Sequence, residues 1–241
     1  MLVLTTFSIT ARCPQTGMLG TAVCTAIPGV GGLASFVKAG TGAVSTQSFV
    51  NPYLGIDSLS LMTEGKSARE ALETVLAADP GRETRQLAVV DAAGNAAGHT
   101  GSECIPWHGH VVGNGYVAAA NMMVDEKTTA AMVAAFEAST GEPLPERLLK
   151  ALEAGDATGG DFRGRQSASL LVYKTEEYPY VSLRVDENMQ PVQELRRIFE
   201  TCRTQLLPLM DAMPSRANPL GDINPDDPNI ANLIKHVNER T

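Results

Sequence analysis

Hydrophobic and polar positions alternate near the start of the chain. Between residues 5 and 12, Thr6, Ser8 and Thr10 fall on one side of an extended backbone, and Phe7 and its apolar neighbours fall on the other. This period of two predicts a half-buried strand that carries a row of hydroxyls on its polar face. Extended segments are also expected at residues 18–26, 43–48, 86–90, 96–99, 108–112, 116–121, 167–173 and 180–185.

Helical spacing and start signals appear between these strands. Asn51 precedes Pro52, a pair suited to a helix start, and Ser67 is followed three residues later by Glu70, as in a capping box. Helices are predicted at residues 52–64, 67–78, 126–139, 143–153 and 192–207. Grouped helices between hairpin-rich strands favour an α+β fold with antiparallel sheets over a doubly wound parallel sheet.

The C-terminal part is rich in proline. We expect one domain over residues 6–207 and an extended tail over 208–241, with a short helix at 230–239. Ile230, Leu233, Ile234 and Val237 form a narrow apolar stripe on that helix, which is more suited to docking on a neighbouring surface or subunit than to standing alone. A homo-oligomer is therefore expected.

Composition limits the classes of partner. The 241 residues are 44% hydrophobic and 19% charged, as in an ordinary globular protein, and the net charge is −8. This acidic balance gives no support to a nucleic-acid or anionic-membrane partner. No apolar stretch reaches the roughly 20 residues that span a bilayer, and no secretory pattern is seen, so a cytoplasmic protein is expected. The widely spaced Cys13, Cys24, Cys104 and Cys202 are predicted to be reduced and buried.

Thr6 is the main candidate for chemistry. An N-terminal threonine can attack an amide with its hydroxyl while its own α-amino group, with a pKa of about 7.7 to 8.0, accepts the proton. This requires a free amine, so residues 1–5 would have to be absent. The alternative is that Thr6 only lines the face of a strand.

Histidines offer weaker candidates. His108 and His110 are two apart, so in a strand both point the same way, but no third ligand is evident and no metal or other cofactor is expected. His99, at a strand end, is either an acid or base or a hydrogen-bonded structural residue. The glycine-rich segment 28–32 lacks the Gly-Lys-Ser/Thr ending of a phosphate loop and does not open a convincing helix.

Polar groups also gather before the strand at 167–173. Arg163 and Arg165 flank a glycine and could clamp a substrate carboxylate, or simply pair with Asp161 and another acid; Gln166 follows them. Asn121 ends a strand, where it could donate to an oxyanion or act as a turn residue.

Several segments, taken together and in order, carry a resemblance to a known family. They are TFSITAR, KAGTGAVSTQSFVNPYLG, AADPGRETRQLAVVDAAGNAAGHTG, the step Ile105-Pro106-Trp107, GNGYVAAANMM and GGDFRGRQSASLLV. Over residues 6–207 the chain resembles the bacterial family catalogued as domain of unknown function 1028. That family is grouped with the N-terminal-nucleophile (Ntn) hydrolases, so the resemblance implies a four-layer αββα sandwich.

The resemblance also places Thr6 at the nucleophile position. On the residues themselves, Asn121 is the other catalytic candidate, and substrate contacts are expected from Gln47, His99, Arg163, Arg165 and Gln166. The implied activity is an amidohydrolase acting on a small amide or peptide-like bond. The alternative is a non-catalytic oligomeric binding or structural protein of the same fold.

The start of the chain departs from that pattern. Similar sequences commonly begin Met-Thr-Phe-Ser, whereas Met-Leu-Val-Leu-Thr precedes Thr6 here. A start codon upstream of the usual one, a short self-cleaved propeptide or loss of activity would each explain the difference.

Overall fold

In the computed structural model the chain divides into two units. The structure describes residues 3–4, 6–159, 163–222, 224, 228 and 231. One unit is Met1–Leu195 and the other is Arg196–Thr241, so the division falls inside α6 (Pro191–Gln205). The second unit also holds α7 (Leu207–Met210). The helix expected at 230–239 falls almost wholly outside the described residues, and the boundary expected at 207 stays a prediction.

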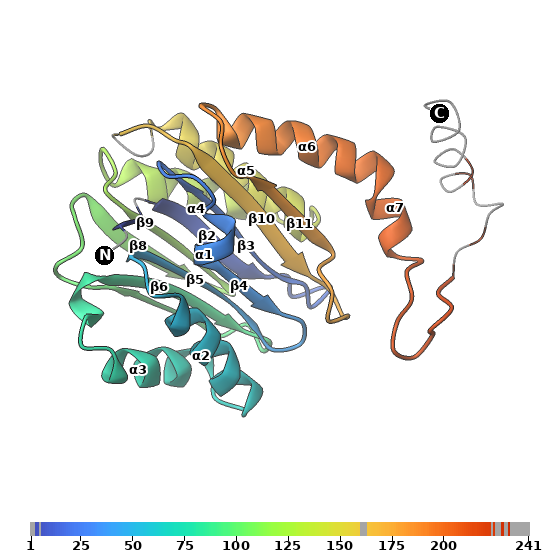
Figure 1. Cartoon of the computed structure of the whole chain (residues 1–241), viewed down its shortest axis with the longest axis horizontal. Coiled ribbons are helices and arrows are strands. Elements are labelled where there is room, and N and C mark those ends of the chain that lie inside the picture. Colours follow the sequence, from blue (N-terminus) through green and yellow to red (C-terminus); the bar gives the residue numbers. More distant parts are fainter. Residues whose placement is uncertain are drawn as a thin grey trace. The chain divides into compact units, whose positions relative to one another are not determined.

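Two antiparallel sheets make up the first unit (Figure 1). The first sheet has the order β1-β5-β6-β7, and β4 also pairs with β5. Its strands are β1 (Val3–Leu4), β4 (Ser35–Lys38), β5 (Gly42–Phe49), β6 (Arg85–Asp91) and β7 (Ala96–Thr100). The second sheet has the order β11-β10-β3-β2-β9-β8. Its strands are β2 (Thr6–Arg12), β3 (Leu19–Thr25), β8 (His108–Gly113), β9 (Tyr116–Asn121), β10 (Ser167–Tyr173) and β11 (Val181–Val185).

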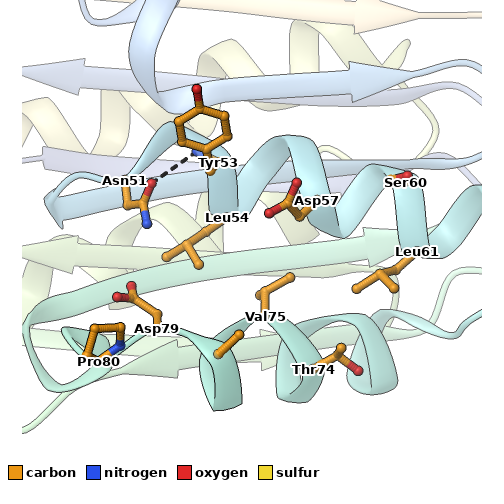
Figure 2. A pocket seen from close by; sticks show the side chains of 11 residues that line it. Asn51, Tyr53, Leu54, Asp57, Ser60, Leu61, Thr74, Val75, Asp79 and Pro80 are labelled. Carbon is orange, nitrogen blue, oxygen red and sulfur yellow. Dashed lines mark hydrogen bonds between the residues drawn. The ribbon is translucent and has the colours of Figure 1, made fainter.

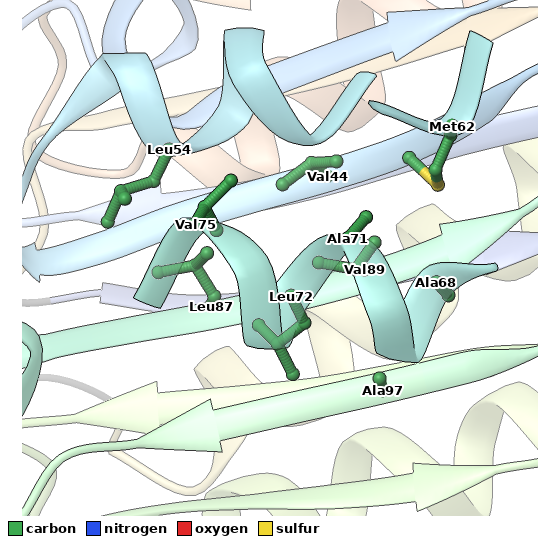
Figure 3. Close-up of a cluster of buried hydrophobic side chains, with 10 residues drawn as sticks. All are labelled: Val44, Leu54, Met62, Ala68, Ala71, Leu72, Val75, Leu87, Val89 and Ala97. Carbon is green, nitrogen blue, oxygen red and sulfur yellow. The ribbon is translucent and has the colours of Figure 1, made fainter. Parts of the chain in front are cut away.

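The helices pack against these sheets, which confirms an α+β fold. Helices α2 (Pro52–Thr63) and α3 (Ala68–Ala78) contact the first sheet, and α4 (Lys127–Ala138) and α5 (Leu144–Ala157) contact the second. Figure 3 shows the apolar cluster between α2, α3 and the first sheet. Its members are Val44, Leu54, Met62, Ala68, Ala71, Leu72, Val75, Leu87, Val89 and Ala97. Within the described part of the chain, no helix has the length and apolarity needed to cross a bilayer.

Both faces of β2 are buried. On its hydroxyl face, Ser8 Oγ donates to Oε1 of Gln47 in the first sheet at 2.7 Å. On its apolar face, Phe7 meets α5 at Gly155, where an added Cβ would come within 3.1 Å of the Phe7 ring. The prediction of a half-buried strand is therefore wrong. A period of two identifies the two faces, but it does not reveal that a second sheet covers the polar one.

Several short elements were not expected, among them β1, β4 and the helix α1 (Gly31–Ala34). The last of these begins within the glycine-rich segment that was judged unable to open a helix. Segments of two to four residues are too short for a periodic pattern, so their conformation depends on neighbours that are distant in sequence.

A buried carboxylate ties α3 to the hairpin of β6 and β7. Asp91 accepts hydrogen bonds at 2.9 Å from the backbone N–H groups of Ala68, Ala93 and Asn95, and from Asn95 Nδ2. The predicted capping box is also confirmed, since Ser67 Oγ accepts from Glu70 N while the Glu70 carboxylate accepts from Ser67 N. The Asp91 side chain thus orders both the turn between β6 and β7 and the start of α3.

We expect Asp91→Ala to lower the free energy of unfolding by about 3 kcal/mol, because buried N–H donors lose a charged acceptor. Asn95→Ala, which removes only one of these donors, should cost about 1 kcal/mol. Urea denaturation followed by circular dichroism measures both values. Equal effects of the two variants would contradict a central role for the Asp91 carboxylate.

Candidate functional site

Thr6 lies where the chain passes from one sheet to the other. Val3 and Leu4 pair with β5 of the first sheet, and Thr6 begins β2, where it pairs with Thr25 of the second sheet. The Thr6 side chain is fully buried, and its Oγ1 donates to Thr25 Oγ1 at 3.3 Å. The hydroxyl therefore belongs to the interior between the two sheets.

Gln86 is the centre of the hydrogen-bond network in that interior. Its Nε2 donates to the carbonyl oxygens of Ala120 at 2.9 Å and Gly109 at 3.1 Å, and it lies 2.8 Å from Thr100 Oγ1. Carbonyl oxygens can only accept, so they fix the orientation of the Gln86 amide. Its Oε1 must therefore face the other way, as an acceptor.

The orientation of Gln86 sets the orientation of two further amides. Gln47 Nε2 donates to Gln86 Oε1 at 2.6 Å, and Asn121 Nδ2 donates to the same oxygen at 3.0 Å. Gln47 Nε2 also reaches the carbonyl oxygen of Thr6 at 3.4 Å, and Gln47 Oε1 accepts from Ser8. The structure thus brings three predicted site residues, Thr6, Gln47 and Asn121, into one network.

Two buried polar atoms at this end of the second sheet lack partners in the described part of the chain. They are Asn121 Oδ1 and His108 Nδ1, and the two residues face each other across β8 and β9. In the antiparallel register of β2 and β9, Phe7 pairs with Ala120. Thr6 precedes Phe7 and Asn121 follows Ala120, so the two residues come next to each other when this register is continued. Because an unmade hydrogen bond costs free energy, these atoms mark a place suited to a polar group.

The two histidines of the neighbouring strands have different surroundings. Thr100 Oγ1 lies 2.8 Å from His110 Nδ1 and also accepts from Gln86 Nε2, so Thr100 links His110 to the network. Burial, and next the charge of His99, lower the pKa of His110. His99 itself lies on the other side of β7, with Nε2 2.9 Å from the carbonyl oxygen of Arg82, and does not join the network.

The arginine segment is not drawn into the network either. Arg165 binds Asp156, through its carboxylate and through its carbonyl oxygen at 2.7 Å, while Arg163 is exposed. Gln166 contributes its backbone N–H to the carbonyl oxygen of Thr25 at 2.8 Å. Of these residues, Gln166 alone contacts Thr25, the hydrogen-bond partner of Thr6. Asp161 lies outside the described residues.

The described residues contain no group of three or more histidine, cysteine or acidic side chains placed to hold a metal ion. The cysteines are buried and unpaired with one another, at Cys13, Cys24, Cys104 and Cys202.

A surface pocket of about 440 Å³ lies between α2 and α3, with Tyr53, Asp57, Leu61 and Val75 among its lining residues (Figure 2). A second pocket, of about 290 Å³, lies beside Lys66 and Asn95. Thr6 lines neither pocket, so neither pocket opens onto its side chain.

Gln86, Thr25 and Thr100 were not among the predicted site residues. The sequence signal for Gln86 is slight: one amide at the head of the apolar run 87–90. A polar side chain before a buried strand is equally typical of a strand end, so its role is seen only when both sheets are in place.

Comparison with known proteins identifies the family to which the sequence is similar and solved structures that resemble the fold. Residues 6–195 match the family described as a family of unknown function, DUF1028. The chain is similar to the protein SPO2555 from Silicibacter pomeroyi, with a TM-score of 0.82 and 30% sequence identity, over 92% of this chain and 100% of that one. Anbu (ancestral beta-subunit) from Yersinia bercovieri is less similar, with a TM-score of 0.41 and 13% identity over 87% of this chain and 98% of that one. No curated protein matches the chain.

Replacing Gln86 by leucine should lower the free energy of unfolding by about 3 kcal/mol or more, because the amides of Gln47 and Asn121 then lose a buried acceptor. The exposed Gln193 provides a matched control, and Gln193→Leu should change stability by less than about 0.5 kcal/mol. Urea denaturation compares them. A small effect of Gln86→Leu would mean that the network rearranges without cost.

His110 should titrate below about 6.5, the usual histidine pKa. Because the folded pKa is lowered, this residue contributes stability that is present above pH 6.5 and is lost as the pH falls toward the folded pKa. NMR titration of the His110 ring protons gives the midpoint, and His110→Gln should flatten the stability profile in this window. A midpoint above 6.5 would contradict the assigned effect of burial.

Proposed function

The chain belongs to the DUF1028 family, and we propose that it acts as an Ntn-type amidohydrolase whose nucleophile is the hydroxyl of Thr6. One observation carries this proposal. Thr6 begins a buried central strand immediately after the chain leaves the other sheet, and amides and hydroxyls surround it. An amine created at this position would stand beside its own hydroxyl in a preformed polar environment.

We further propose that the two sheets and their helices form the four-layer αββα sandwich of Ntn hydrolases. Hydrogen bonds between the sheets support this arrangement, from Ser8 to Gln47 and from Asn121 to Gln86. The separation of the helices supports it too, since α2 and α3 contact the first sheet while α4 and α5 contact the second.

Activation requires the peptide bond before Thr6 to be broken. The Thr6 hydroxyl would attack the carbonyl carbon of residue 5, forming an ester while the C–N bond breaks and the proton passes to the nitrogen. Water then hydrolyses the ester and leaves Thr6 with a free amine and a free hydroxyl. Amides and hydroxyls but no carboxylate take part in the described Thr6 network, so burial would lower the pKa of this amine and favour its neutral, basic form.

Asn121 then has two tasks available to it. Its Nδ2 carries two hydrogens and gives one to Gln86, so the second is available to an oxyanion, together with a backbone N–H. Its unpaired Oδ1 is an acceptor for the Thr6 amine. We assign no carboxylate clamp to Arg165, because Asp156 already engages its guanidinium.

A non-catalytic role is the second candidate, and one observation favours it. Thr6 is fully buried and its hydroxyl already has a partner in Thr25, as expected of a structural threonine. In that case the chain is a binding or structural protein, with its C-terminal segment as a subunit contact.

The Thr6→Val variant tests catalysis, and Thr10→Val is its matched control. Thr10 lies on the same buried face of β2, and its hydroxyl pairs across to Thr21 at 3.5 Å, much as Thr6 pairs with Thr25. Intact-mass analysis should show loss of residues 1–5 in the wild type and in Thr10→Val but not in Thr6→Val. Only the first two should form an adduct with an electrophilic β-lactone.

Two results would count against the hydrolase. One is a wild-type chain that keeps residues 1–5 and takes no label, which favours the non-catalytic role. The other is equal labelling of Thr6→Val, which would place the nucleophile elsewhere.

A further inference from the structure

The N-terminal strand β1 occupies part of one edge of β5. Along Gly42 to Ser48, β6 pairs with β5 on one side. On the opposite side, β4 pairs only with Gly42 to Ser45, and β1 pairs with the remaining end through Val3 with Phe49 and Leu4 with Ser48. We call Ser48 and Phe49 the docking edge.

We propose that the docking edge is a binding site for an extended peptide, and that Val3 and Leu4 occupy it in cis. Pairing with a strand edge uses backbone hydrogen bonds, which any extended peptide can supply. In the chain itself, the residues on this edge lead within two positions to Thr6. A peptide bound in the same way would present to the Thr6 hydroxyl the amide bond that follows its third residue, which corresponds to residue 5 of the chain.

The docking edge is held rigidly from behind. Ser48 pairs with Arg85 on β6, and the Arg85 guanidinium donates to the carbonyl oxygen of Phe49. Arg85 Nε is in turn 2.7 Å from Asp79 Oδ2, in an ion pair whose side chains are 12% and 6% exposed. A rigid edge pays little entropy on binding, so even a short strand can dock on it.

The backbone at Ser48 is itself unusual. Its φ of 68° lies in the left-handed region, which a residue other than glycine seldom adopts. Strained or sparsely populated backbone is often retained where it positions a functional group. Here it shapes the end of β5 at the point where β1 docks.

The cis occupant is a very short strand. β1 has only two residues, so its pairing adds few backbone hydrogen bonds to β5. It stays bound mainly because it is covalently linked to the rest of the chain, which gives it a high effective concentration at the docking edge. An external peptide therefore competes poorly while Val3 and Leu4 are in place and well once they leave. That such a peptide is also a substrate rests on the proposed function; that it binds does not.

The ligand class follows from this geometry. The site is suited to an extended peptide, because β1 pairs with it as an antiparallel strand. Recognition through the backbone gives broad sequence tolerance. A single amino-acid amide, which cannot form a strand, should bind far more weakly.

Fluorescence anisotropy of labelled acetyl-Val-Leu-Thr-amide tests the site. It is measured on the full chain carrying Thr6→Val, so that neither processing nor turnover takes place. Adding Leu4→Pro removes an N–H from β1 and should tighten binding at least tenfold. Leu4→Ala keeps the backbone donor and should leave the affinity unchanged. The same peptide N-methylated at its backbone amides should not bind.

Hydrogen exchange on the Thr6→Val chain gives a second measurement that needs no proline variant. Excess peptide should speed exchange at Val3 and Leu4 while Ser48 and Phe49 stay protected. No binding to either chain, or equal binding of the N-methylated peptide, would overturn the docking edge. A third outcome separates the two proposals. If Thr6→Val binds the peptide but the wild-type chain is neither processed nor labelled, the docking edge is supported and the hydrolase activity is rejected.

Discussion

The inability of a backbone carbonyl to donate a hydrogen bond organises the interior of this protein. Two such carbonyls, of Ala120 and Gly109, fix the Gln86 amide. That amide orients Gln47 and Asn121, and Gln47 in turn sets the hydroxyl of Ser8. A chain of neutral groups is thereby locked into one pattern of donors and acceptors, and Thr6 stands at its end.

The same network joins the two sheets. Burying amides and hydroxyls between sheets is costly unless each has a partner, so the polar end of the interior specifies how the sheets meet. Towards the other end, small apolar residues fill the space, with Ala88, Val90 and Val117 in one cluster. Apolar packing stabilises the assembly, whereas the polar end determines its register and provides the chemical groups.

Local patterns predicted most of the fold. The alternation from Thr6 to Arg12, the proline after Asn51 and the capping box at Ser67 each act within a few residues. The strand and the two helix starts that they predict are confirmed, whereas the expected half-burial of the strand is wrong. The failures are long-range. β1 is a strand because β5 is beside it, and Gln86 is central because two sheets meet around it. No neighbouring residue in the sequence carries that information. Thr6 could be proposed from a family resemblance and Asn121 from its place at a strand end, but His99 and Arg165 have partners of their own that only the folded chain reveals.

The central position of β2 in its sheet would restrict the motion of a chain terminus created at Thr6. Termini usually fray, but β2 lies between β3 and β9 and is covered on both faces. Its amides are therefore of the kind that exchange with solvent only when the whole domain opens. A terminus created at Thr6 would be among the least mobile points of the molecule, with an amine whose direction the sheet determines.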